Sequence, residues 1–362
     1  MEKILIISTE WGHSSIAKSV GQVVNKYYDV EIHSIKIEKF SKVSYEFIYK
    51  FIPGFFKLVF ALSEVNLIKQ IFGYYAEKSY KKQLEHKIKQ ARPKIVVNTY
   101  FAFNSSLESL KNKYGFRLLN VIANPRTFTK IEISPYAENL VFDKYSFKKV
   151  KAANPNNSCT LTGWFTESKF YEVKKEKRAR VRKMLGLDPN KFTLCITSGS
   201  EGTYNVLKIV NTFLNPKYNM QVIIMCGNNS QLLKTAKTLK SVSKTIGGPE
   251  IAGIPYTTEV QKYLRASDIV VGKAGPNTIF ESVATLTPFF AISHVSGQEN
   301  GNLEIIKKYK IGYVEEKPVL ATLRLKEIIE NPKILSKFQN NLKALSAYNQ
   351  NSERKLLKLL RP

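Results

Sequence analysis

The chain has 362 residues, of which 43% are hydrophobic and 12% aromatic, so it holds enough apolar material for two hydrophobic cores and is not a largely disordered protein. Its 56 Lys and Arg residues outnumber its 29 Asp and Glu residues and give a net charge of +27, which excludes the near-neutral balance of an ordinary cytosolic enzyme and indicates an anionic partner. Nucleic acid and an anionic membrane surface both fit this charge, so the charge alone does not decide between them.

The first predicted element is a buried parallel strand over residues 1–8, which is too short for a signal peptide and is followed by no cleavage pattern. A loop and an amphipathic helix through Val24 follow, and His13 lies in the loop, where open parallel sheets bind ligands. A neutral imidazole there could take a hydroxyl proton, although a histidine beside a turn can also serve structure alone. Glu10 is the rival base, provided that burial against Trp11 raises its pKa.

The next segment, residues 36–89, interleaves lysines with many Tyr and Phe residues and is more apolar than a nucleic-acid-binding face requires. Residues 44–62 fit a helix that lies in a membrane interface while its lysines reach lipid phosphates; an aromatic-rich pair of core helices is the alternative. Lys57 and Glu64 interrupt the best candidate for a spanning helix, which needs about 20 apolar residues. We therefore expect the region near residues 44–82 to contact an anionic membrane surface.

Two further strands are predicted at residues 94–98 and 117–122, and the segments that follow them should line the ligand-binding edge of the first sheet. Arg126 and Lys130 in this region could meet a lipid phosphate or lie in a solvated loop. The polar, turn-rich residues 151–158 suggest a domain boundary, and the basic run at residues 174–182 reads as a solvated helix face. Three scattered cysteines without metal-ligand spacing read as core residues in a reducing cytoplasm.

The second half begins with a strand at residues 192–197 and a glycine loop in which Gly199 and Ser200 permit close approach of the backbone to a phosphate. After the strand at residues 267–271, Gly275, Pro276 and Thr278 stand where a strand passes into a helix, with backbone N–H groups available to a diphosphate. Glu281 falls inside that helix, where its carboxylate can accept hydrogen bonds from a ribose diol. A tight turn that serves only the backbone is the simpler reading of this motif taken by itself.

A second polar motif, residues 297–302, follows the apolar run at residues 287–292. It contains Gln298, Glu299 and Asn302, whose side chains suit sugar hydroxyls and phosphate oxygens. Each motif is weak by itself, but the ordered pair favours a nucleotide-sugar site over two unrelated turns.

From residue 195 to residue 312 the chain resembles the inverting glycosyltransferases that include plant monogalactosyldiacylglycerol synthase and bacterial processive diacylglycerol glucosyltransferases. The lipid II-forming N-acetylglucosaminyl transferase is a more distant relative. The resemblance is carried in family order by residues 198–202, 225–229, 268–276 and 297–302. It implies an α/β protein with the GT-B fold, in which two Rossmann-like domains with parallel sheets face a central cleft. The implied domains are residues 1–155 for the acceptor and the membrane, residues 156–335 for the UDP-sugar, and residues 336–362 as a helix packing back toward the first domain.

The resemblance implies inverting transfer of a hexose from a UDP-sugar to diacylglycerol or a glycosylated diacylglycerol, with no metal or other cofactor. A polyprenyl-diphosphate-linked sugar is an alternative acceptor. A non-catalytic peripheral membrane protein is a further alternative, since Glu10 and Trp11 replace the glycines that precede Gly12 and His13 in the family. The absence of a zinc-finger or helix–turn–helix signature argues against specific nucleic-acid binding, and the expected location is the cytoplasmic face of the cell membrane.

The implied roles of the site residues are as follows. Ile254 would pack on uracil, and His13 or Glu10 would be the base. The remaining contacts to the donor are assigned to Gly199, Ser200, Gly275, Pro276, Thr278, Glu281, Gln298, Glu299 and Asn302.

Overall fold

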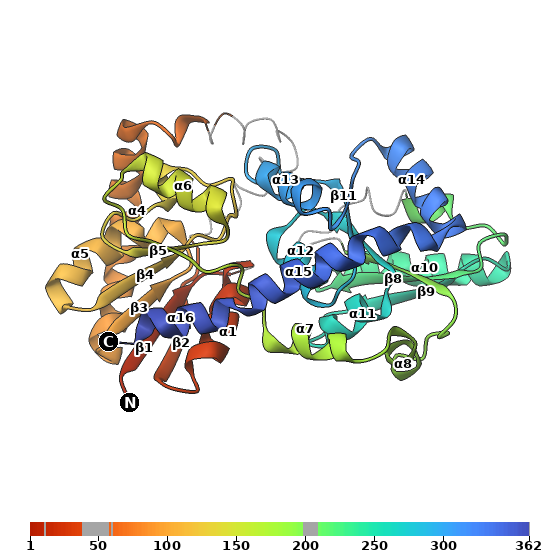
Figure 1. Ribbon diagram of the computed structural model, residues 1–362, viewed down its shortest axis with the longest axis horizontal. Coiled ribbons are helices and arrows are strands. Elements are labelled where there is room, and N and C mark those ends of the chain that lie inside the picture. The colour runs from red at the N-terminus through yellow and green to blue at the C-terminus, as the bar shows by residue number, and fades with distance from the viewer. Residues whose placement is uncertain (11, 38–57, 59–60, 198–208, 362) are drawn as a thin grey trace. The chain divides into compact units, whose positions relative to one another are not determined.

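A computed structural model describes residues 1–10, 12–37, 58, 61–197 and 209–361 (Figure 1). The chain divides into two compact units. The first comprises Met1–Glu167, Val295–Gly301 and Tyr348–Pro362, and the second comprises Ser168–His294 and Asn302–Ala347. The domain ranges expected from the sequence stay a prediction, and each compact unit is described below by itself.

The first unit is built on a six-stranded parallel sheet with the strand order β2-β1-β3-β4-β5-β6. Residues Ile4 to Ile7 of the central strand β1 are fully buried, as the apolar run at the amino terminus predicts. The strands are β1 (Lys3–Ser8), β2 (Asp29–Ser34), β3 (Ile95–Asn98), β4 (Arg117–Val121), β5 (Glu138–Val141) and β6 (Cys159–Leu161).

The helices of this unit bury apolar side chains. The long helix α4 buries Tyr80, Leu84 and Ile88 in a core that also contains Phe103. Asp143 caps α6 by accepting a hydrogen bond from the backbone N–H of Ser146, so that helix begins at Lys144. The helical segments are α1 (Gly12–Val24), α4 (Asn66–Ala91), η1 (Phe101–Phe103), α5 (Asn104–Tyr114), η2 (Lys130–Glu132), α6 (Lys144–Ala153) and α16 (Ser352–Leu360).

The second unit is built on another six-stranded parallel sheet, with the order β12-β11-β10-β7-β8-β9. Its strands are β7 (Phe192–Thr197), β8 (Met220–Gly227), β9 (Glu250–Pro255), β10 (Ile269–Lys273), β11 (Phe289–Ser293) and β12 (Gly312–Val314). Its helical segments are α7 (Ser168–Glu172), η3 (Val173–Lys175), α8 (Arg178–Met184), α10 (Ser230–Thr245), α11 (Val260–Ala266), α12 (Pro276–Ala284), α13 (Asn300–Tyr309), α14 (Pro318–Glu330), η4 (Pro332–Phe338) and α15 (Gln339–Gln350). The α/β class with two Rossmann-like units is confirmed.

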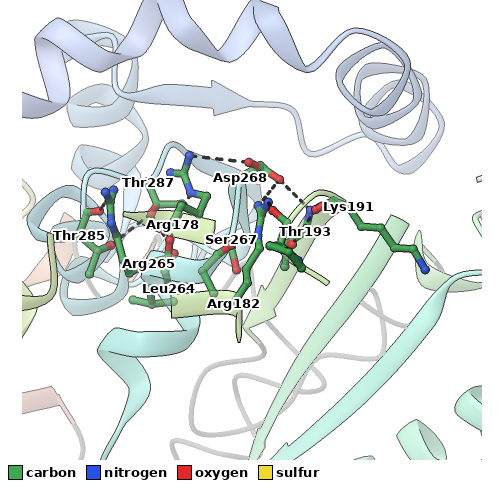
Figure 2. A network of polar contacts seen from close by, with 12 residues as sticks. Arg178, Arg182, Lys191, Thr193, Leu264, Arg265, Ser267, Asp268, Thr285 and Thr287 are labelled. Atoms are coloured by element: carbon green, nitrogen blue, oxygen red, sulfur yellow. Dashed lines mark hydrogen bonds and ion pairs between the residues drawn. The ribbon is translucent and has the colours of Figure 1, made fainter. Parts of the chain in front are cut away.

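Arg178, Arg182 and Arg265 form a polar network with Asp268 at the amino-terminal edge of the second sheet (Figure 2). Asp268, just before β10, accepts hydrogen bonds from Arg182 at 2.6 Å and from the backbone N–H of Thr193 at 2.7 Å. Arg265 donates to the carbonyl oxygens of Glu176 and Thr285, the second of which ends α12. Arg182 is only 6% exposed, so the interpretation of the whole basic run as a solvated helix face is wrong at this residue.

No helix in the described part of the chain is both long enough and apolar enough to cross a membrane.

Candidate functional site

The predicted nucleotide contacts Ile254, Gly275, Pro276 and Thr278 lie in the second unit, toward the carboxyl edge of its sheet, whereas Gln298 and Glu299 belong to the first unit. Because all of the strands are parallel, β7, β9, β10 and β11 end at this same edge. Open parallel sheets bind ligands at the carboxyl ends of their strands. Ile254 is partly exposed near the end of the edge strand β9. Gly199 and Ser200 lie outside the described residues, so their role stays a prediction.

Helix α12 begins directly beyond β10 and presents its positive end at this edge. Gly275 is the N-cap residue, it offers no side-chain cap, and Pro276 occupies the first turn. No acidic residue lies in that turn, so the partial positive charge of the helix N-terminus is not neutralised by its own sequence. Gly275, Pro276 and Thr278 are partly exposed. A helix N-terminus of this kind is suited to a phosphate group.

A hydrogen bond brings the two polar motifs of the sequence together. The amide Nδ2 of Asn302, in the first turn of α13, donates to the carbonyl oxygen of Ala274 at 2.7 Å. The backbone N–H of Ala274 in turn donates to the carbonyl oxygen of Ser293 at the end of β11, at 2.8 Å. The segment that leads into α12 is therefore fixed from both sides by the elements that flank the second motif.

The side chains of the second motif differ in how much they are exposed. Glu299 is 5% exposed, and its Oε2 accepts a hydrogen bond from the backbone N–H of Val295 at 2.7 Å, so this carboxylate stabilises its own loop. Asn302 is also buried, whereas Gln298 is partly exposed. Glu281 in α12 is partly exposed as well. The predicted contacts of these residues with a donor stay predictions.

The sequence reasoning missed a contact between a histidine and a carboxyl group at the carboxyl edge of the second sheet. His294 follows β11 directly, and its Nδ1 lies 2.6 Å from Oε1 of Glu316, which follows β12. The sheet-end rule that selected the neighbouring residues could have found His294, because it stands just past a predicted strand.

The candidate base His13 lies in the first turn of α1 in the first unit. Its Nδ1 is 2.5 Å from the carbonyl oxygen of Thr99, and its ring packs edge-on against Tyr100 with 4.9 Å between ring centroids. A carbonyl can only accept a hydrogen bond, so Nδ1 carries the proton and Nε2 is the basic nitrogen. Burial lowers the pKa of His13 to about 4, so the imidazole is neutral at pH 7.

Glu10 is partly exposed just before α1. The residue against which its burial was expected, Trp11, lies outside the described residues. The role of Glu10 as a rival base therefore stays a prediction.

Aromatic rings connect His13 to helix α4. Tyr100 packs on Phe101 with 5.0 Å between centroids, and Phe101 stacks on Phe72 of α4 at 5.7 Å. The sequence indicated the aromatic content of this region but not this order, because α4 and the segment after β3 are separated in the sequence.

The amino-terminal half of α4 and the residues before it expose an apolar face. Most of residues 44–60, where the interfacial helix was expected, lie outside the described residues. Lysines follow along the same helix, among them Lys78 and Lys82. The exposed apolar residues are Leu58, Leu62, Val65, Leu67, Ile71, Tyr74 and Tyr75.

Arg126 is neither solvated nor available to a lipid phosphate. It is 6% exposed and donates to Oδ2 of Asp143 through Nε at 3.0 Å and through a terminal nitrogen at 2.7 Å. Burial would raise the pKa of Asp143, but the hydrogen bonds from Ser146 and Arg126 lower it below its ordinary value. Both sequence interpretations of Arg126 are therefore wrong.

Within the described ranges, no group of three or more His, Cys, Asp or Glu side chains is arranged to hold a metal ion.

Both halves of the chain match models of known protein families. Residues 13–160 match the model for monogalactosyldiacylglycerol (MGDG) synthase, and residues 193–359 match the model for the glycosyltransferase family 28 C-terminal domain. The chain therefore combines two domains that each match a glycosyltransferase model. This confirms the family predicted from the ordered motifs.

Individual relatives agree with this assignment. A processive diacylglycerol beta-glucosyltransferase from Bacillus licheniformis is 22% identical over 96% of this chain and 92% of its own length. The UDP-N-acetylglucosamine–N-acetylmuramyl-(pentapeptide) pyrophosphoryl-undecaprenol N-acetylglucosamine transferase of Fusobacterium nucleatum is 30% identical over 50% of this chain and 51% of its own length. Among solved structures, TcCGT1 in complex with UDP has a TM-score of 0.64 at 10% identity and covers 99% of this chain and 98% of its own, which shows the fold alone.

Proposed function

We propose that this glycosyltransferase moves a hexose from a UDP-sugar to the hydroxyl of diacylglycerol or a glycosylated diacylglycerol, with inversion at the anomeric carbon and without a metal. The observation that carries the proposal is the carboxyl edge of the second sheet, where Asn302 joins the second polar motif to the segment leading into α12. The full-length similarity to a processive diacylglycerol glucosyltransferase supports the choice of acceptor.

The nucleotide of the donor is proposed to bind in the second unit. The N-terminus of α12 would receive the diphosphate, since its first turn holds no carboxylate that would repel it. Glu281, one turn further, would accept hydrogen bonds from the ribose, and Ile254 would pack on uracil. Gln298 and the backbone of its loop would meet the sugar, while buried Glu299 and Asn302 hold the shape of that loop.

The acceptor is proposed to react at His13 in the first unit. Nε2 of the neutral ring takes the proton of the acceptor hydroxyl as the hydroxyl oxygen forms its bond to the anomeric carbon. The bond from that carbon to the diphosphate breaks, and UDP leaves with the electron pair. The N–H groups of α12 stabilise the negative charge that develops on the leaving oxygen, so no metal is required in this proposal.

The lipid acceptor is proposed to come from a membrane that docks on the apolar face of α4. Leu67, Ile71 and Tyr74 would enter the interface, and the net charge of +27 would attract anionic headgroups. The rings of Phe72, Phe101 and Tyr100 lead from this helix to His13 and offer an apolar path to an acylated glycerol. A cytoplasmic membrane face, as expected from the sequence, belongs to the same proposal.

Vesicle sedimentation tests the docking face. A Leu67→Ser and Ile71→Ser double variant should bind vesicles of anionic phospholipid at least about tenfold more weakly than the parent, since two large apolar side chains lose their contact with the acyl region. Val319→Ser with Leu323→Ser in α14 is the control, because these residues are also apolar and exposed, by 72% and 57% against 62% for Leu67 and 46% for Ile71, but lie in the second unit. Equal weakening by both double variants would contradict a docking face on α4.

A polyprenyl-diphosphate-linked sugar is the second candidate acceptor, because the Fusobacterium nucleatum relative is 30% identical over half of this chain. Competition separates the two candidates. If diacylglycerol is the acceptor, it should suppress transfer to an added polyprenyl-diphosphate sugar. Suppression of transfer to diacylglycerol by the polyprenyl-diphosphate sugar would favour the polyprenyl compound.

A further inference from the structure

Three buried asparagines stand in register across the first sheet. Asn98 ends β3, and it pairs with Asn120 on β4, which pairs with Asn139 on β5. Their exposed fractions are 0%, 2% and 0%. Nδ2 of Asn98 lies 3.5 Å from Oδ1 of Asn120, and Nδ2 of Asn120 donates to Oδ1 of Asn139 at 2.9 Å. We call this row of side chains the asparagine ladder.

Asn98 is the end of the ladder that faces the candidate base. Its Nδ2 donates to the carbonyl oxygen of Tyr100 at 3.0 Å, and its Oδ1 accepts from the backbone N–H of Tyr100 at 3.1 Å. Nδ2 also donates to Oδ1 of Asn104 at 2.8 Å, which fixes the orientation of the amide. One side chain therefore holds both backbone polar groups of Tyr100.

The turn that Asn98 holds carries both contacts to the His13 ring. The carbonyl oxygen of Thr99 meets Nδ1, and the ring of Tyr100 packs on the imidazole. Thr99 is also fixed to β1, because its N–H donates to the carbonyl oxygen of Ile7 at 3.1 Å. A small shift of this turn would change the direction in which Nε2 of His13 points.

We propose that Asn98 is a positioning residue that orients His13 for proton transfer, with Asn104 as its direct support. The catalytic consequence rests on the proposed function, whereas the orientation of the ring does not. The alternative is that the buried amides serve only to hold the strands together. In that case, replacing Asn98 would not change the orientation of the His13 ring.

The titration of His13 can be used to detect a change in the position of its ring, since few titratable groups surround it in the described structure. Tyr100 packs on the ring, and burial raises its pKa, so it stays neutral near pH 7. Glu10 precedes α1 on the same segment, and Thr99 presents only neutral groups. The chain has four histidines, so the ring signals of His13 can be assigned in an NMR spectrum with a His13→Asn variant.

Asn98→Ser and Asn139→Ser form the matched pair of variants. Both remove a fully buried amide of the ladder, but only Asn98 touches the turn at Thr99 and Tyr100. In Asn98→Ser the pKa of His13 should rise by about one unit toward its ordinary value, because a looser turn admits water to the ring. Turnover should fall about 10- to 100-fold, with the KM for the donor within about twofold, since a displaced base affects chemistry and not donor binding.

In Asn139→Ser the pKa of His13 and the turnover should match those of the parent. If Asn98→Ser does not fold, Asn104→Ser tests the same link, because it removes the group that fixes the Asn98 amide without changing a strand. A His13 titration that stays unchanged in Asn98→Ser and Asn104→Ser, or that moves equally in Asn139→Ser, would overturn the inference. A shifted titration in a protein whose parent transfers no sugar would support the positioning role and contradict the proposed function instead.

Discussion

The side-chain amide of Asn302 donates a hydrogen bond of 2.7 Å to the backbone carbonyl of Ala274. These two residues belong to the two polar motifs that stand 28 positions apart in the sequence. The bond is buried, and it fixes the segment that leads into α12 at the carboxyl edge of the second sheet. Asn302, the last residue of the second motif, therefore holds the segment that leads into α12 within the second unit.

Replacing Glu281 with alanine should weaken UDP binding about tenfold or more, because a hydrogen bond to a charged group contributes about 1.5–3 kcal/mol. Isothermal titration calorimetry with UDP measures this directly. Glu304→Ala is the control, since Glu304 lies on the exposed side of the neighbouring helix α13. Unchanged UDP affinity in Glu281→Ala would contradict its assignment to the ribose.

Replacing His13 with alanine should lower turnover about 10²- to 10⁴-fold, the usual contribution of a general base. The KM for the UDP-sugar should stay within about twofold, because His13 is assigned to the acceptor hydroxyl and not to the donor. His86→Ala, an exposed histidine on α4, should leave turnover unchanged. Comparable losses in the two variants would show that His13 has no special part in the reaction.

The pH dependence of stability should also report on His13. Its pKa is about 4 in the folded chain against 6.5 for an ordinary histidine, so between these values the unfolded chain binds a proton that the folded chain does not. Stability should therefore fall as the pH is lowered from about 6.5 to about 4. Urea unfolding across this range should show a smaller fall in His13→Asn, and an identical fall would contradict the low pKa.

The sequence predicts the positions of the strands and the residues that follow them better than it predicts how the elements pack. The apolar runs at residues 94–98 and 267–271 correspond to β3 and β10. The hydrophobic pattern and the length of each run are enough to identify a buried strand. The sheet-end rule then selects Gly275 and His13, since each follows such a strand closely. The order of the strands and the partners of each side chain are set by packing between distant segments, which a single sequence does not contain.

Two residues illustrate what the sequence could not predict. Arg126 reads as a loop cation, but Asp143 pairs with it in the interior, and only the fold brings the two together. Arg182 reads as one of several surface cations, yet it is buried and donates to Asp268 and to the carbonyl oxygen of Ala266. A pattern of charge in a sequence does not distinguish the two sides of a short helix.

Glu132 should make the protein less stable as the pH rises. Burial raises the pKa of this carboxyl to about 7 against an ordinary 4.5, so between these values the folded chain keeps a proton that the unfolded chain has released. Stability should fall by about 3 kcal/mol across this window, and Glu132→Gln should remove that part of the pH dependence. Unfolding free energies at pH 5 and pH 8 test this, with Glu304→Gln as the control; equal pH dependence in all three proteins would refute it.

Removing Asp268 should destabilise the second unit strongly. Asp268→Ala leaves Arg182, which has 7% side-chain exposure, without its carboxylate, and breaking a buried ion pair costs about 3–5 kcal/mol. The exposed pair Arg324 and Glu327 on α14 supplies the control, since Glu327→Ala should cost less than about 1 kcal/mol. Urea unfolding distinguishes the two, and similar losses would show that the polar network at Asp268 is not a stabilising feature.

The most direct test of the account is the transfer of radiolabelled hexose from UDP-glucose and UDP-galactose to diacylglycerol in anionic liposomes. The parent and the His86→Ala and Glu304→Ala controls should form a labelled glycolipid from one of the two donors, whereas His13→Ala and Glu281→Ala should form little. Failure of the parent to label diacylglycerol while it still binds UDP would contradict the proposed acceptor.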